Sequence, residues 1–162
     1  MQIRDATLDD WPAIWAFMRG IAAAGETFSW DRDIPEDVAR ARWFAGPPVR
    51  TVVAVDDDGT VLGSAVTGPN HGGPASHVST ASFMVDPARA GHGVGRALGE
   101  RVLELAREDG YRSMQFNAVV EANRPAVALW RKLGFEIIGT VPEGFLHPTE
   151  GYVGLHIMYQ RL

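Results

Sequence analysis

Apolar residues recur along the chain at helical spacing in four segments. In the first segment Ile14, Phe17 and Ile21 share one face, and Thr7 with Asp10 three positions later gives a capping-type start. Glycine and proline mark where the segments stop. The predicted helices are residues 11–24, residues 36–44, a segment from Val94 to near Gly110, and a segment that Asn123 caps and Gly134 ends.

Segments rich in β-branched residues predict the strands. The turn Asp56-Asp57-Asp58-Gly59 joins the first two strands as a hairpin, and residues 68–74, with three Gly and two Pro, form a loop. Residues 2–6 are too short to assign. The predicted strands are residues 50–55, 61–67, 77–85, 112–120, 135–141 and 152–160. This mixed order of strands and helices predicts an α+β or three-layer α/β/α protein.

Length and composition narrow the class of protein. The 162 residues suit one domain over residues 1–162, and the absence of cysteine excludes disulfide frameworks and thiolate chemistry. A formal net charge of -5 argues against nucleic acid as a partner. No apolar run approaches the roughly 18 residues of a membrane span, and the first residues lack the order of a signal peptide. We therefore expect a cytoplasmic protein with no membrane partner.

A glycine-rich turn lies between the strand at 77–85 and the helix that begins at Val94. Glycines at alternate positions open the backbone, and free N–H groups at a helix start attract phosphate. The alternative is an ordinary flexible loop. A nucleotide P-loop is excluded because Arg96-Ala97 follows Gly95, and the spacing also fails the dinucleotide fingerprint. The predicted phosphate-binding residues are Gly91, His92, Gly93, Val94, Gly95 and Arg96.

Two runs in the chain resemble signatures of the GNAT acetyltransferase superfamily. Residues 91–98, GHGVGRAL, resemble its acetyl-CoA pyrophosphate loop, and residues 123–135, NRPAVALWRKLGF, resemble its second signature. The resemblance implies a mixed, mostly antiparallel, twisted sheet of six to seven strands flanked by about four helices. It also implies acetyl-CoA as cosubstrate, with pantetheine between two splayed strands. The residues implied to hold that arm are the backbones of Phe83 and Val85, together with Asn123.

The sequence departs from the superfamily pattern at two positions. Ala90 stands where the loop consensus begins with Arg or Gln. Trp130 stands where a tyrosine often protonates the CoA thiolate, and an indole N–H is too weak an acid for that role. We place Trp130 among the cofactor-binding residues. We expect a backbone N–H near Met84 to polarise the thioester carbonyl.

A narrower similarity links the chain to a GNAT branch that acetylates proline analogues such as azetidine-2-carboxylate. It rests on residues 114–123, on Trp130 and on residues 139–142. In that branch the residue that corresponds to Asn117 lies beside the thioester, and at the position of a second asparagine this chain has Thr80. An amide within an apolar strand needs a partner, which independently marks Asn117.

Transfer of an acetyl group to an amine needs a neutral nitrogen, so a proton acceptor near the site would favour the reaction. The candidates are His77, Glu121, and Thr80 as the holder of a water molecule; for His77 and Glu121 the alternative is an ordinary surface position. The five histidines show no metal-ligand spacing, and no nucleophile elbow occurs. The predicted acceptor side comprises Phe28, Ser29, Trp30 and a loop over residues 142–150.

The sequence therefore predicts an acetyl-CoA-dependent N-acetyltransferase of a small-molecule amine, such as an amino acid or proline analogue, without a metal. Two alternatives stay open: a catalytically idle acetyl-CoA-binding regulatory module, and a protein N-acetyltransferase. The resemblance implies a homodimer, because members of the superfamily commonly form dimers. The same expectation is supported by apolar residues near the end of the chain, which are Leu155, Ile157, Met158 and Tyr159.

Overall fold

The computed structural model describes residues 1–162, and it contains seven strands and four α-helices. The elements in chain order are β1 (Gln2–Asp5), α1 (Trp11–Ala24), α2 (Glu36–Trp43), β2 (Arg50–Val55), β3 (Val61–Pro69), β4 (Val78–Val85), α3 (Val94–Glu108), β5 (Ser113–Val120), α4 (Arg124–Lys132), β6 (Glu136–His147) and β7 (Gly151–Arg161). The predicted fold class is confirmed. The four helices and six strands expected from sequence are all present, and β1 is the added strand.

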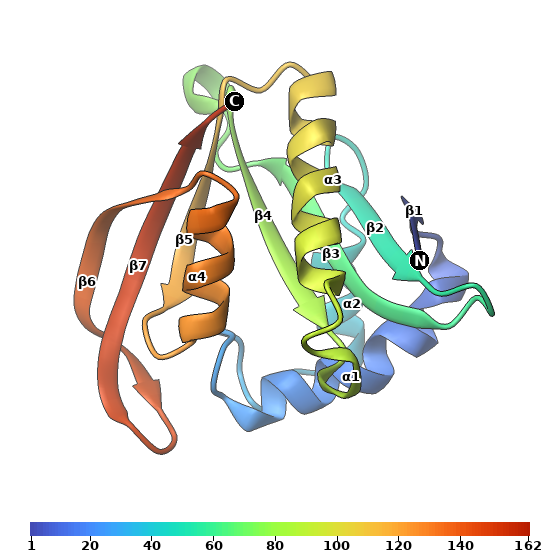
Figure 1. Ribbon diagram of the computed structural model, residues 1–162, viewed down its shortest axis with the longest axis horizontal. Coiled ribbons are helices and arrows are strands. Elements are labelled where there is room, and N and C mark those ends of the chain that lie inside the picture. The colour runs from blue at the N-terminus through green and yellow to red at the C-terminus, as the bar shows by residue number, and fades with distance from the viewer.

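The strands form one sheet in the order β1-β2-β3-β4-β5-β7-β6. Every neighbouring pair is antiparallel except β4 and β5, which run parallel. These two strands pair only at Val78 with Ser113 and at Ser79 with Met114. Beyond that point they diverge, and the sheet opens between them (Figure 1).

The helices cover both faces of the sheet. Helices α3 and α4 lie on one face, and α1 and α2 lie on the other (Figure 1). Each face has its own buried hydrophobic cluster: one includes Leu98 of α3 and Trp130 of α4, and the other includes Ile14 of α1 and Trp43 of α2. The divergence of β4 and β5 is therefore flanked by packed layers on both sides.

The structure corrects the predicted boundaries near the end of the chain. The loop expected over residues 142–150 is mostly strand, because β6 continues to His147 and pairs there with β7. The pairing is irregular between Val141 and Phe145, and Glu143 has a φ of 53° within that interval. Local sequence did not reveal this continuation, because Pro142 and Gly144 disfavour a regular strand.

The apolar residues near the end of the chain, from which a homodimer is predicted, lie on β7. This strand is paired on both sides, and Met158 is completely buried. The exposed apolar side chains of this region are instead Ile138, Val141, Leu146 and Tyr152. No helix in the structure has both the length and the apolar character needed to cross a membrane.

Candidate functional site

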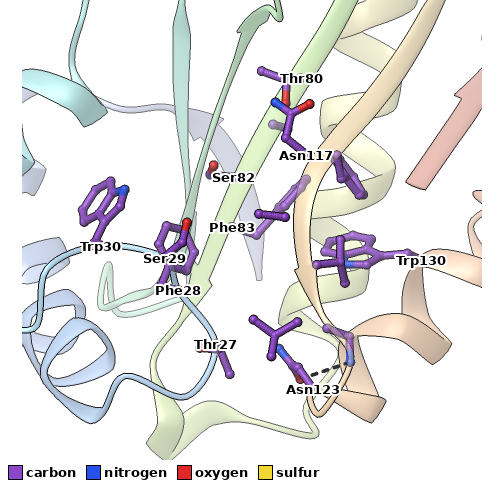
Figure 2. A pocket seen from close by; sticks show the side chains of 16 residues that line it. Thr27, Phe28, Ser29, Trp30, Thr80, Ser82, Phe83, Asn117, Asn123 and Trp130 are labelled. Carbon is purple, nitrogen blue, oxygen red and sulfur yellow. Dashed lines mark hydrogen bonds between the residues drawn. The ribbon is translucent and has the colours of Figure 1, made fainter. Parts of the chain in front are cut away.

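A cavity of about 270 Å³ lies where β4 and β5 diverge (Figure 2). Its walls come from β4, β5, the start and middle of α4, and the loop between α1 and α2. The lining residues are Thr27, Phe28, Ser29, Trp30, Thr80, Ala81, Ser82, Phe83, Phe116, Asn117, Ala118, Val119, Val120, Asn123, Ala126 and Trp130. Its size is just below the usual range for small-ligand sites, which is about 300–1,000 Å³.

A bulge in β5 shapes one wall. Phe116 pairs with Met158 and Val119 pairs with His156, so β5 has an extra residue between two pairs of the ladder. As a result the consecutive residues 116–120 all line the cavity instead of alternating between the two faces. Bulges that re-aim side chains are common beside active sites.

Asn117 and Thr80 lie at the end of the cavity nearest to the β4–β5 pairing (Figure 2). The amide nitrogen Nδ2 of Asn117 donates to Oδ1 of Asn70 over 2.6 Å, and Nδ2 of Asn70 donates back to Oδ1 of Asn117 over 3.3 Å. Nε2 of Gln115 also donates to Oδ1 of Asn117, over 2.9 Å. The amide predicted from sequence therefore reaches the cavity, and its partners are two further amides.

Aromatic rings close the cavity on the side of α4. The indole of Trp130 is 7% exposed and packs against Phe83 and Phe116, with ring centroids 4.6 Å and 4.9 Å away. Phe116 in turn stacks on Phe135 at 4.2 Å. The Trp130 indole N–H donates no hydrogen bond within the chain, and no tyrosine lines the cavity. Trp130 thus forms part of a packed aromatic wall.

Asn123 stands at the opposite end of the cavity, at the N-terminus of α4 (Figure 2). Its Oδ1 accepts a hydrogen bond of 3.4 Å from the backbone N–H of Ala126, so it caps the helix. Its amide nitrogen has no partner in the chain. One side chain can therefore cap α4 and donate to a ligand in the cavity.

The glycine-rich turn leads from β4 into the N-terminus of α3. Gly91 and Gly93 have φ values of 81° and 79°, which L-residues rarely adopt, and a Cβ at either position would meet nothing within 4 Å. Gly95 differs, because its Cβ would lie 3.4 Å from Leu129 of α4. The first two glycines thus shape an open turn, whereas the third faces α4 at an ordinary contact distance.

The side chains around this turn are exposed. His92 directs Nδ1 at the backbone oxygen of Ala90, 3.0 Å away, and Arg96 forms an ion pair of 2.8 Å with Glu100. Backbone N–H groups at the start of α3 and the positive end of its dipole make the turn suitable for a phosphate. Val94 is buried and anchors the first turn of the helix.

The loop between α1 and α2 covers the remaining side of the cavity. Phe28 and Trp30 pack edge to face with centroids 5.3 Å apart, and Trp30 packs in the same way on Trp43 at 5.9 Å. The Trp43 indole donates a 2.8 Å hydrogen bond to the buried Ser64 hydroxyl. This aromatic packing joins the loop to the core, so the predicted acceptor-side residues 28–30 do reach the cavity, whereas residues 142–150 do not.

The cavity is lined without a charged side chain or a histidine. His77 is exposed just before β4, and only its backbone oxygen has a partner, the N–H of Arg112 at 3.0 Å. Glu121 also lies outside the cavity, and its Oε2 accepts a 2.9 Å bond from the N–H of Gly154. Asn117 and Thr80 therefore both line the cavity, whereas the carboxylate of Glu121 and the imidazole of His77 lie outside it.

Sequence reasoning missed four polar residues of the site: Thr27, Asn70, Ser82 and Gln115. Asn70 lies in a segment that reads only as a Gly/Pro loop, 47 residues before its partner Asn117. Gln115 carries a detectable signal, because it lies two positions before Asn117 on the same strand and so on the same face. No group of three or more His, Asp or Glu side chains is arranged to hold a metal ion.

Comparison with known proteins gives a consistent family match. Residues 10–135 match the profile of the acetyltransferase (GNAT) family. A GCN5-related N-acetyltransferase from Kribbella flavida is 56% identical in sequence, with a TM-score of 0.96 over 99% of this chain and 97% of that chain. A phosphinothricin acetyltransferase from Sinorhizobium meliloti, solved in complex with acetyl-CoA, is 25% identical, with a TM-score of 0.89 over 99% of this chain and 88% of that one.

Curated relatives extend the same comparison. The L-methionine sulfoximine/L-methionine sulfone acetyltransferase of Pseudomonas aeruginosa is 36% identical over 152 residues, which is 87% of this chain and 83% of the relative. The N-acetyltransferase aca1 of Schizosaccharomyces pombe is 32% identical over 111 residues, and the alignment spans 68% of this chain but only 53% of the relative's length.

Proposed function

The chain belongs to the acetyltransferase (GNAT) family, and we propose that the amine it acetylates is a small molecule. It is an N-acetyltransferase, and its acetyl donor is acetyl-CoA. The observation that carries the proposal is the cavity between β4 and β5, where residues 27–30 of the loop between α1 and α2 line one side. This loop narrows access for an acceptor, which favours a small molecule, whereas a protein acceptor would need an open groove for a chain segment.

The residues present fit the donor at three places. The N–H groups of residues 91–96 would receive the pyrophosphate, because Gly91 and Gly93 leave the turn open and the dipole of α3 points at it. The edge of β4 that faces β5 is open at Phe83 and Val85, beyond the β4–β5 pairing, and its backbone groups would bond the pantetheine amides. The free amide nitrogen of Asn123 would hold the same arm from the other wall of the cavity.

Acetyl-CoA supplies an activated thioester, and the amine nitrogen forms a bond to its carbonyl carbon while the carbon–sulfur bond breaks. We assign polarisation of the carbonyl oxygen to a backbone N–H near Met84, which is buried beside the cavity wall. A fixed dipole of this kind needs no reorganisation during the reaction. The indole of Trp130 packs against the reacting region and does not protonate the thiolate, so the thiolate takes its proton from water.

The proton of the amine needs a route out of a cavity that has no acid or base in its walls. Thr80 and Ser82 place hydroxyls on β4 where they can hold a water molecule that accepts it (Figure 2). His77 and Glu121 remain candidates only as later acceptors, through solvent, because neither lines the cavity. We expect turnover to rise with pH toward the pKa of the amine, since only its neutral form attacks.

The acceptor we favour is a small amine, with amino acids and proline analogues as the first group to test. The named relatives from Pseudomonas and Sinorhizobium act on amino-acid-like compounds. Phe28 and Trp30 offer apolar contact, and Thr27 and Ser29 offer hydroxyls, to the part of the acceptor beyond the nitrogen.

We also propose a cytoplasmic homodimer that covers the exposed Ile138, Val141, Leu146 and Tyr152.

A panel of acceptors tests the proposal. The panel contains amino acids, cyclic imino acids, aliphatic and aromatic amines, and a peptide with a free N-terminus and a lysine. The readouts are release of the CoA thiol and the mass of the product. We expect at least one small amine to be acetylated much faster than the peptide. Acetylation of the peptide alone would indicate a protein acetyltransferase, and binding of acetyl-CoA without any transfer would indicate a regulatory module.

A further inference from the structure

We propose that Asn70 and Gln115 are positioning residues that fix the carboxamide of Asn117 with an N–H, and not its oxygen, directed into the cavity. The inference rests on the proposed function, because it assigns a role to two side chains at the same site. It goes beyond that function by specifying which atom of Asn117 meets the reactants.

The hydrogen bonds around Asn117 leave one group free. A carboxamide oxygen can accept two hydrogen bonds, and the amide nitrogen can donate two. Oδ1 of Asn117 already accepts from Gln115 at 2.9 Å and from Asn70 at 3.3 Å. Nδ2 donates once, to Oδ1 of Asn70 at 2.6 Å. The remaining capacity of the side chain is a single N–H donor.

The fold brings the three amides together at the point where β4 and β5 separate. Asn70 follows the end of β3, and its backbone N–H donates to the oxygen of Val78 over 2.8 Å, which ties it to the start of β4. Gln115 pairs with Tyr159 just before the bulge in β5, and Asn117 lies within the bulge, where the two side chains meet through their 2.9 Å hydrogen bond. The cluster therefore joins β3, β4 and β5 at the end of the cavity nearest to the β4–β5 pairing.

The free N–H of Asn117 can donate either to the attacking nitrogen or to an oxygen atom, and the two contacts have opposite effects on the reaction. A donor to the attacking nitrogen would engage the lone pair that must form the new bond, so it would slow the reaction. A donor to an oxygen stabilises charge that develops on the thioester carbonyl, or binds an oxygen atom of the acceptor. We therefore assign Asn117 to contact an oxygen, and we assign Asn70 and Gln115 to keep its amide from turning over.

Two substitutions add the same negative charge on either side of Asn117 and have opposite consequences for its orientation. Gln115→Glu replaces the donor to Oδ1 with an acceptor, so the amide of Asn117 turns its nitrogen to position 115 and its oxygen to the cavity. Asn70→Asp keeps an acceptor for Nδ2 and loses the 3.3 Å donor to Oδ1, but Gln115 still donates to Oδ1 over 2.9 Å, so the native orientation is retained. Gln115→Ala removes one bond without favouring either orientation.

We expect Gln115→Glu to lower kcat on the order of 10²-fold, which is the scale for loss of one preorganised donor. Gln115→Ala and Asn70→Asp should each lower it by less than about tenfold, and the KM for acetyl-CoA should stay within about twofold in all three. Equal losses in Gln115→Glu and Asn70→Asp would overturn the proposal, because charge alone would then explain both. A loss in Gln115→Ala as large as in Gln115→Glu would overturn it too, because a merely structural role would suffice.

A second measurement separates this inference from the proposed function. In protein labelled with ¹⁵N-asparagine and without substrates, the side-chain amide protons of Asn117 should show contacts to Asn70 in the wild type. In Gln115→Glu they should show contacts to the side-chain methylene protons at position 115. Unchanged contacts would overturn the orientation argument whatever the enzyme acetylates. If no amine is a substrate, the proposed function fails, but these spectra still decide the orientation of the amide.

Discussion

The rings of Phe83 on β4 and Trp130 on α4 lie with their centroids 4.6 Å apart, so a side-chain contact joins α4 to β4 where β4 has separated from β5. β4 and β5 no longer pair at this level, and the aromatic contact through Phe116 closes the space behind the cavity. Trp130 therefore has a packing role in this chain. We expect the chemistry to be organised from β4 and β5.

Replacement of Asn117 on β5 and of Trp130 on α4 tests which of these two elements organises the chemistry. Asn117→Ala should lower kcat by roughly 10²–10³-fold, because it removes the donor at the reacting centre, and should leave acetyl-CoA affinity nearly unchanged. Trp130→Phe should cost less, since a ring is retained. Steady-state kinetics on folded variants checks both. Near-normal turnover of Asn117→Ala, or a much larger loss at Trp130, would move the chemistry to α4.

The phosphate role of the glycine-rich turn is tested by a pair of glycines with the same backbone strain. Gly93 and Gly110 flank opposite ends of α3, with φ values of 79° and 81° and open space around a Cβ. Leucine at either position should cost about 1–2 kcal/mol of unfolding free energy. Only Gly93→Leu should also weaken acetyl-CoA binding, by about tenfold or more in calorimetry. Equal affinities in the two variants would contradict the assignment.

Contact between α3 and α4 depends on the missing side chain of Gly99. A Cβ there would lie 2.6 Å from Leu133 and 3.1 Å from Trp130, so Gly99→Ala should push α4 outward, lower the Tm and reduce acetyl transfer. Gly20→Ala on α1 meets nothing within 4 Å and is the matched control. It should raise stability by about 0.5–1 kcal/mol through helix propensity. A Gly99→Ala variant with a Tm above that of the wild type would show that α3 and α4 accommodate the added methyl group without a clash.

The ion pair at the start of α1 predicts a dependence of stability on pH. Asp10 accepts hydrogen bonds from Arg4 at 2.7 and 2.8 Å and from the N–H of Thr7 at 2.8 Å. The Arg4 guanidinium, with help from Thr7, lowers the pKa of Asp10 in the folded protein. A lowered pKa contributes stability above the unfolded value of about 3.9, and that stability is lost as the pH falls through the folded value.

Urea denaturation of Asp10→Asn measures this contribution. The variant should be less stable than the wild type by about 1–3 kcal/mol at pH 7, and the difference should shrink below about pH 4. Asp9→Asn, which removes an exposed neighbouring carboxylate without an ion pair, should change stability by less than about 0.5 kcal/mol. A difference that stays constant down to pH 2.5 would show that the carboxylate of Asp10 is not what stabilises the helix start.

Most of the fold could be predicted because its signals are local. Helix periodicity, the turn that ends at Gly59 and the caps at Asn123 and Gly134 locate the four helices, and the strands other than β1 and β6, within a few residues. The early end of β4–β5 pairing and the bulge after Phe116 could not be predicted, since both depend on how distant strands register. The same limit applies to β6, whose continuation past Pro142 depends on pairing with β7.

The candidate site was predictable to the extent that it is built from contiguous motifs. The turn at 91–96 and Asn123 were visible in sequence because backbone conformation and helix capping leave local marks. The partners of Asn117 were not all visible, since Asn70 is brought to it only by the packing of β3 beside β4. The expected proton acceptors failed to reach the cavity for a related reason: Glu121 lies past the end of β5, where its carboxylate bonds β7.

The central claim is that the cavity between β4 and β5 transfers an acetyl group to a small amine, and stoichiometry tests it most directly. Wild-type protein is incubated with acetyl-CoA and each amine of the panel, and free CoA thiol and acetylated amine are quantified together. The account predicts amine-dependent thiol release in which each CoA released matches one acetylated amine, with Asn117→Ala slower by roughly 10²-fold or more. Thiol release that no small amine accelerates, with acetyl groups found only on peptide or in free acetate, would contradict it.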